Sequence, residues 1–172
     1  MEMDSTVEES KDLSAYLQQQ AGKTLPAWEE LPDIELYMDQ VVALTNRYLG
    51  NVTKEKQLTA SMVNNYVKMK AMPAPVKKKY AREHLMYLIV ICVLKQVMPL
   101  SSVESILRES LRSAEPAVFY ERFRELYAQA FRVAAEETGG ACAEGAAPMD
   151  ALLGLALKAQ AEQSLAQGML EI

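Results

Sequence analysis

The stretch that decides the fold is TASMVNNYVKMKAMPAPVKKKYAREHLMYLIVICVLKQVMPLSSVESIL, residues 59–107. Its middle is interrupted by Pro73 and Pro75, which cannot donate a backbone hydrogen bond and push the preceding residue to an extended conformation. The segment from Pro73 to Ala81 is therefore predicted to be extended and to form a small hairpin. Three consecutive lysines, Lys77–Lys79, would lie at the tip of this hairpin.

A helix is predicted on each side of the hairpin. Thr59 can cap the first helix, which covers residues 60–70. The second covers residues 82–97 and is apolar on all sides, which indicates a buried central helix. Ser101 and Glu104 have the spacing of a capping box and predict that another helix starts there.

Helical spacing also dominates the rest of the chain, so the sequence predicts an all-α protein. Further helices are expected over residues 6–20, over 34–49 with Asp33 as its cap, from Pro116 to the stop at Gly139 and Gly140, and over 149–170. Three parts follow from this pattern: an acidic N-terminal helix and loop (1–32), a central domain (33–112) and C-terminal helices (113–172).

The composition excludes several functional classes. Half of the 172 residues are apolar and about a quarter are charged, as in ordinary globular proteins. Two cysteines, Cys92 and Cys142, are too few for a disulfide framework or a four-thiolate zinc site. The single histidine, His84, excludes a His-rich metal centre. Because nucleotide-loop, hydrolase and metalloprotease motifs are also missing, we expect no metal, no cofactor and no enzyme.

The start of the chain and its longest apolar run predict a soluble cytoplasmic protein without a membrane partner. Residues 1–12 are acidic and polar, unlike the basic and apolar regions of a signal peptide. The run from Leu85 to Leu94 has about half the length that a bilayer span needs.

Charge is distributed unevenly along the chain. The net charge is −5, yet residues 59–95 carry +6, because seven basic side chains are opposed by Glu83 alone. Such a basic island is typical of a polyanion-binding surface. A solvated lysine loop is the simpler alternative.

Residues 33–107 contain two helices joined by a polar connection and followed by the basic hairpin, as a helix-turn-helix would require. Such a motif places its second helix in the DNA major groove, where Asn pairs with adenine and nearby lysines neutralise phosphates. The residues predicted to contact double-stranded DNA are Thr59, Ser61, Asn64, Asn65, Lys68, Lys70, Lys77, Lys78, Lys79 and Arg82.

Residues 59–107 resemble the winged helix-turn-helix of MerR-type transcription regulators. That family has a capped recognition helix with an internal Tyr, then Pro, a basic wing ending in Tyr, a hydrophobic helix and a short turn with Ser before another helix. Thr59, Tyr66, Pro73, Tyr80 and Ser101 stand at the matching places. Two residues depart from the family pattern: Asn64 replaces a usual Arg, and Lys70 replaces the Gly that ends the recognition helix.

A closer resemblance is to an uncharacterised family of Firmicute proteins, described as a domain of unknown function with a MerR-like fold. The phrases LPDIELYMDQV, MVNNYVK and PAPVKKKYAREHL carry this resemblance, which covers roughly residues 31–110. It implies a MerR-like winged helix-turn-helix core with a small β wing. The predicted function is therefore that of a DNA-binding transcriptional regulator. A helical protein–protein interaction module that uses the same fold without DNA is the alternative.

A homodimer is also predicted, because specific DNA sites are usually read by two-fold dimers. The helix from Pro116 carries apolar residues at coiled-coil spacing: Phe119, Phe123, Leu126, Ala130 and Val133. Packing of this face against the last helix of the same chain is the alternative.

Overall fold

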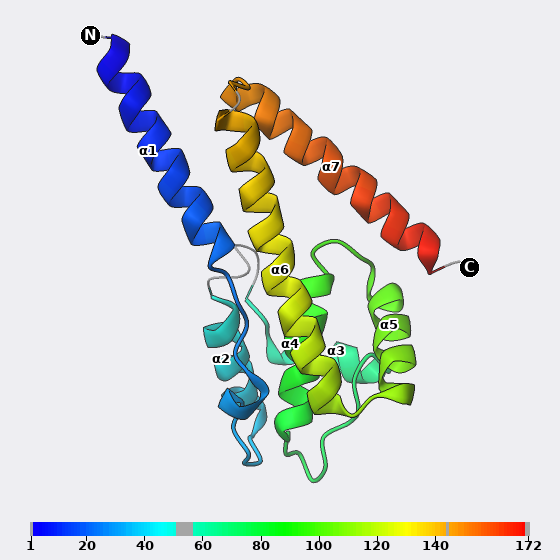
Figure 1. Cartoon of the computed structure of the whole chain (residues 1–172). Helices are drawn as coiled ribbons and strands as arrows, with labels where there is room; N and C mark the ends of the chain where they lie inside the picture. Colours follow the sequence, from blue (N-terminus) through cyan, green and yellow to red (C-terminus); the bar gives the residue numbers. More distant parts are fainter. Residues whose placement is uncertain (1, 51–56, 144, 171–172) are drawn as a thin grey trace. The chain divides into compact units, whose positions relative to one another are not determined.

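The computed structural model describes residues 2–50, 57–143 and 145–170, and within these ranges the side chains from residue 12 onward except that of residue 148 (Figure 1). Its helices are α1 (Glu2–Ala21), the 3-10 helix η1 (Trp28–Glu30), α2 (Met38–Leu49), α3 (Ala60–Lys68), α4 (Arg82–Leu94), α5 (Leu100–Ser113), α6 (Pro116–Ala143) and α7 (Pro148–Met169). The all-α prediction is confirmed. The described residues contain no β-strand and only two isolated β-bridges.

The chain divides into two compact units. The core unit contains Leu25–Arg124 and residues 167–170, and the terminal unit contains residues 2–24 and Glu125–Ala166. Neither boundary coincides with the predicted ones at residues 32 and 112. The difference arises because Leu25 and Leu31 are fully buried, and because the Tyr120 hydroxyl of α6 donates a hydrogen bond of 2.9 Å to the Pro26 carbonyl.

Helix α4 is the centre of the core unit, as its uniformly apolar sequence predicts. Leu85, Met86 and every residue from Leu88 to Ile91 are inaccessible to solvent. Helices α2 and α5 pack on α4, and α3 packs on α2. His84 caps the start of α4, because its Nδ1 accepts a hydrogen bond of 3.0 Å from the backbone N–H of Ala81.

The starts of several helices differ from the predicted ones; α1, for instance, begins at Glu2 rather than at residue 6. Helix α2 starts at Met38 rather than Ile34, because Leu36 is extended and exchanges two backbone hydrogen bonds of 2.8 Å with Tyr80. The expected capping box at α5 is also wrong: the helix starts at Leu100, directly after Pro99.

The glycines of α6 do not stop it, contrary to expectation. Glycine within a helix costs only about 1 kcal/mol, so Gly139 and Gly140 remain helical. The helix ends where Gly145 adopts φ 94°, with hydrogen bonds from Gly145 N to Cys142 O and from Ala146 N to Ala141 O. These two bonds form the Schellman motif that commonly terminates helices.

Within the terminal unit, α7 leaves many large apolar side chains in solvent. The exposed fractions reach 57% for Leu152, 55% for Leu153 and 68% for Leu157. None of the helices in the described ranges combines the length and apolarity that a bilayer span requires. Helix α7 thus presents exposed leucine side chains to solvent.

Candidate nucleic-acid interface

Helix α3 presents a polar face, and hydrogen bonds fix the position of its N-terminus. The Thr59 hydroxyl accepts a hydrogen bond of 3.3 Å from Met62 N, so the predicted cap is confirmed. The Asn46 side chain of α2 binds both the N–H and the carbonyl of Leu58, at 2.8 and 2.9 Å. Val63 and Tyr66 are buried beneath the helix. The residues left exposed on its outer side include the predicted Ser61, Asn64, Asn65 and Lys68.

Lys70 ends α3 in a left-handed conformation with φ 59°. Its N–H bonds to Val67 O at 3.0 Å, and Ala71 N bonds to Tyr66 O at 2.9 Å, which is a second Schellman motif. Glycine usually occupies this position because it lacks the Cβ that makes the conformation costly. Lys70 therefore adopts, at this helix end, a conformation for which glycine is the usual residue.

The basic tip is a two-residue hairpin turn. Val76 and Lys79 exchange backbone hydrogen bonds of 3.2 and 2.9 Å, and Lys77 and Lys78 between them have φ 49° and 64°. Positive φ at both central residues defines a type I′ turn, for which Asn-Gly is the preferred sequence. The predicted hairpin is thus present, and both central lysines are exposed at its tip.

Among the described residues, the non-glycine positions with positive φ are Lys70, Lys77 and Lys78. All three belong to the set that the sequence predicts to contact DNA. A left-handed conformation costs a side-chain-bearing residue about 1–2 kcal/mol. The chain thus has lysine at three positions where glycine would adopt the left-handed conformation at a lower free energy.

Two other predicted DNA contacts have partners within the protein. The Lys79 ammonium lies 3.0 Å from the Glu35 carboxylate, and this hydrogen bond raises the pKa of Lys79. The Arg82 guanidinium lies 3.9 Å from Asp33 and 5.6 Å from the centre of the Trp28 ring. By contrast, Lys68, Lys70, Lys77 and Lys78 have no side-chain hydrogen bond or ion pair with any residue of the described ranges.

The partners Glu35 and Asp33 are the residues that sequence reasoning missed. Glu35 and Lys79 are 44 positions apart, and no local pattern relates them. Their contact follows from the Leu36–Tyr80 bridge, which brings the two segments together. The tip of the hairpin is therefore formed by Lys77 and Lys78, whereas Lys79 and Arg82 also stabilise its base.

Residues 26–129 match the family model described as "Domain of unknown function (DUF1836)". The match covers more than half of the chain. The chain belongs to this family. No curated protein and no solved structure matches it significantly. Membership of a family of unknown function is confirmed, while the MerR-like winged helix stays a prediction.

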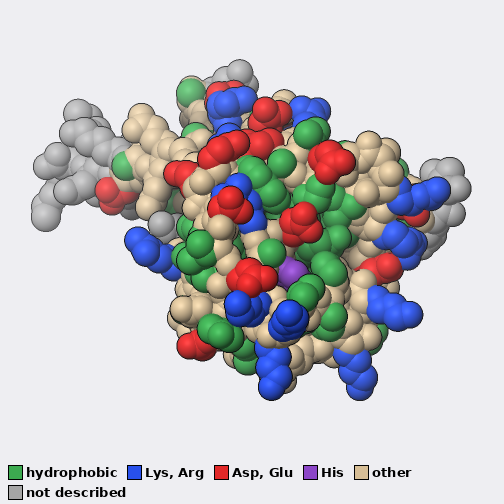
Figure 2. All heavy atoms as spheres, turned by 90° about the horizontal axis from the view of Figure 1, so that it is seen from below, with side chains coloured by type: hydrophobic (Ala, Val, Ile, Leu, Met, Phe, Trp, Pro, Cys, Tyr) green, Lys and Arg blue, Asp and Glu red, His purple; other side chains and the backbone are tan. Residues whose placement is uncertain are grey.

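The DUF1836 region contains α2 to α5, the hairpin and the start of α6, and thus all ten residues of the predicted DNA contact. Figure 2 shows Lys and Arg side chains protruding at the margins of one face of the molecule, with Asp and Glu side chains among them. The strained Lys70, Lys77 and Lys78 lie in the same compact unit as the polar face of α3. This region is therefore the candidate interface.

Proposed function

We propose that the DUF1836 region is a MerR-like winged helix-turn-helix that binds duplex DNA as a transcriptional regulator. The observation that carries the proposal is the placement of lysine at the left-handed positions 70, 77 and 78. Because glycine or asparagine would hold these conformations at lower free energy, positive charge is the property that lysine adds there. Backbone strain retained at an exposed surface is typical of functional sites.

The geometry of α3 supports its role as the recognition helix. Asn64 and Asn65 are exposed on the side opposite Val63 and Tyr66, which anchor the helix in the core. Exposed amides on a rigid helix suit the bidentate hydrogen bonds that identify adenine in the major groove. In the proposed complex, Lys77 and Lys78 contact phosphates beside this groove.

Selection of bound sequences from random duplex DNA tests this proposal. We expect Asn64→Ala or Asn65→Ala to relax the base preference by roughly 1–3 kcal/mol and to leave the melting temperature nearly unchanged. Gln19→Ala, on the exposed side of α1, is the matched control and should leave the preference intact. Purified protein that enriches no sequence and binds no duplex would favour the alternative, a protein–protein interaction module.

Self-association through α6 and α7 is proposed as a second property. Three of the apolar residues predicted at coiled-coil spacing, Leu126, Ala130 and Val133, remain exposed. Together with Leu155 of α7 they line a cleft of about 450 Å³. Packing of α7 against α6 within the chain therefore does not fully bury these three residues. Phe119 and Phe123, by contrast, are half-buried and lie in the core unit.

The exposed leucines of α7 would stabilise a dimer. Burying the solvent-exposed half of one leucine contributes about 1 kcal/mol, so several such residues offset the loss of freedom on association. An apolar surface of this kind is typical of a contact site, and two-fold dimers are the commonest assemblies. The second copy is thus the proposed occupant of this surface.

Removal of α7 should convert a dimer into a folded monomer. The chain would be cut after Ala147, since α6 continues to Ala143 and a cut after Gly139 would shorten it. We expect light scattering to give twice the monomer mass for the full chain and the monomer mass for the shortened one, with a helical circular dichroism spectrum and a cooperative melting transition showing that the rest of the core unit stays folded. A full-length protein that is monomeric at tens of micromolar would contradict the dimer.

A further inference from the structure

A cleft of about 560 Å³ lies at the end of α3, on the core unit. Its volume is within the range typical of small-molecule sites, about 300–1,000 Å³. Its apolar walls include Val67, Met72 and Leu107, of which the last two are buried. The polar residues that line it are Lys70, Tyr87, Glu104 and Arg108.

Two of these polar groups have no partner in the described part of the protein. Neither the Lys70 ammonium nor the Tyr87 hydroxyl makes a hydrogen bond or ion pair with a described residue. Burial and the nearby Glu83 carboxylate raise the pKa of Tyr87, so its hydroxyl remains a donor at neutral pH. Both groups are therefore available to a ligand.

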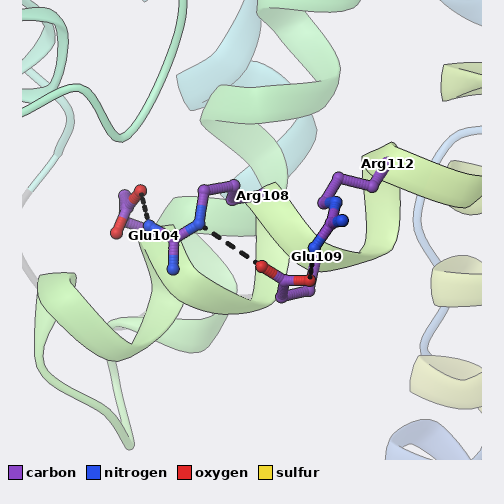
Figure 3. Close-up of polar contacts among 4 residues, drawn as sticks. All are labelled: Glu104, Arg108, Glu109 and Arg112. Carbon is purple, nitrogen blue, oxygen red and sulfur yellow. Dashed lines mark hydrogen bonds and ion pairs between the residues drawn. The ribbon is translucent and has the colours of Figure 1, made fainter.

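The other two charged groups neutralise one another. Arg108 Nη1 lies 2.7 Å from Glu104, and its Nε lies 3.5 Å from Glu109, which in turn binds Arg112 at 2.9 Å (Figure 3). These ion pairs run along α5 and hold the Arg108 guanidinium in place. The charge of Arg108 is thus matched by Glu104, and Lys70 supplies the single net positive charge of the cleft.

We propose that this cleft binds a small monoanionic carboxylate with an apolar or aromatic body. The carboxylate accepts hydrogen bonds from Lys70 and Tyr87, and its body lies against Val67, Met72 and Leu107. A second negative charge is disfavoured, because Glu104 lines the cleft and the carbonyl end of α3 adds partial negative charge.

The site is placed to influence the candidate interface, and this part of the inference rests on the proposed function. Lys70 is both a wall of the cleft and a predicted phosphate contact at the end of α3. A carboxylate bound to Lys70 would neutralise that contact and weaken binding to DNA. Ligand binding itself is independent of DNA and can be measured without it.

Phenylacetate serves as the probe, with phenylacetamide as its neutral counterpart and phenyl phosphate as the dianion. We expect isothermal titration calorimetry on the full chain to give a Kd for phenylacetate in roughly the millimolar range, as suits about ten non-hydrogen atoms. Lys70→Gly should weaken this binding about tenfold. This variant should fold well, because glycine is favoured at φ 59°. Arg47→Gln, on the exposed side of α2 in the same core unit and outside the cleft, is the matched control.

Several outcomes would overturn the inference. These are no heat of binding at the highest probe concentration, equal affinity for phenylacetamide, tighter binding of phenyl phosphate, or an unchanged Kd in Lys70→Gly. A protein that binds phenylacetate through Lys70 but binds no duplex DNA would uphold the cleft and contradict the proposed function. If DNA is bound, saturating phenylacetate should lower that affinity in the wild type and leave it unchanged in Lys70→Gly.

Discussion

Replacement of Lys77 by Asn together with Lys78 by Gly is expected to make the protein more stable and a weaker DNA binder. The two substitutions create the preferred sequence of a type I′ turn, at positions where φ is 49° and 64°. Removing the left-handed strain of two lysines should raise the free energy of unfolding by about 1–2 kcal/mol. The melting temperature, followed by circular dichroism, should then rise by several degrees.

The same double variant loses two proposed phosphate contacts. Its affinity for duplex DNA should fall about equally for all sequences, and the slope of log K against log salt should become shallower by about two units. Fluorescence anisotropy at several salt concentrations measures both. The control is the double variant Lys77→Arg and Lys78→Arg, which keeps the charge and the strain and should keep the slope.

These two measurements separate the structural claim from the functional one. A lower melting temperature for the Asn-Gly variant would contradict the type I′ turn. A higher melting temperature with unchanged affinity and slope would confirm the turn and show that the hairpin does not touch DNA. Lys79 is left in place in both variants, because its ion pair with Glu35 supports the base of the hairpin.

Leu88→Ala should cause the largest loss of stability. Leu88 lies in the middle of α4 and has no solvent-accessible surface. Truncation of such a side chain leaves a cavity and typically costs about 2–5 kcal/mol. Because small proteins are stable by only about 5–15 kcal/mol, this variant should unfold at a much lower urea concentration.

Leu157→Ala in α7 is the matched control for this truncation. Leu157 is 68% exposed, so in dilute protein its replacement should change the free energy of unfolding by no more than about 0.5 kcal/mol. If Leu88→Ala lowered the free energy of unfolding by less than about 1 kcal/mol, the central position of α4 would be contradicted. A loss for Leu157→Ala that grows with protein concentration would support the dimer through α7.

Several features of the candidate interface could be predicted from the sequence because their causes are local. Thr59 caps α3 through a hydrogen bond to a residue three positions away, and Pro73 and Pro75 exclude helix from the residues beside them. Val63 and Tyr66, three positions apart, lie on the buried side of α3, which leaves the predicted Asn64 and Asn65 exposed.

The start of α2, by contrast, was decided by tertiary structure. Residues 34–37 carry a helical pattern, but Leu36 gains two backbone hydrogen bonds from Tyr80, and these outweigh the local preference. The same pairing brings Glu35 to Lys79. Lys79 is therefore ion-paired, whereas the adjacent Lys77 and Lys78 have no ion pair with a described residue. The helical class, the buried helix and the basic hairpin follow from the amino-acid sequence, since these depend on near neighbours. Which lysine is ion-paired depends instead on the tertiary structure, because the backbone pairing that brings Glu35 to Lys79 joins segments more than 40 residues apart and relies on the packing of the whole core unit.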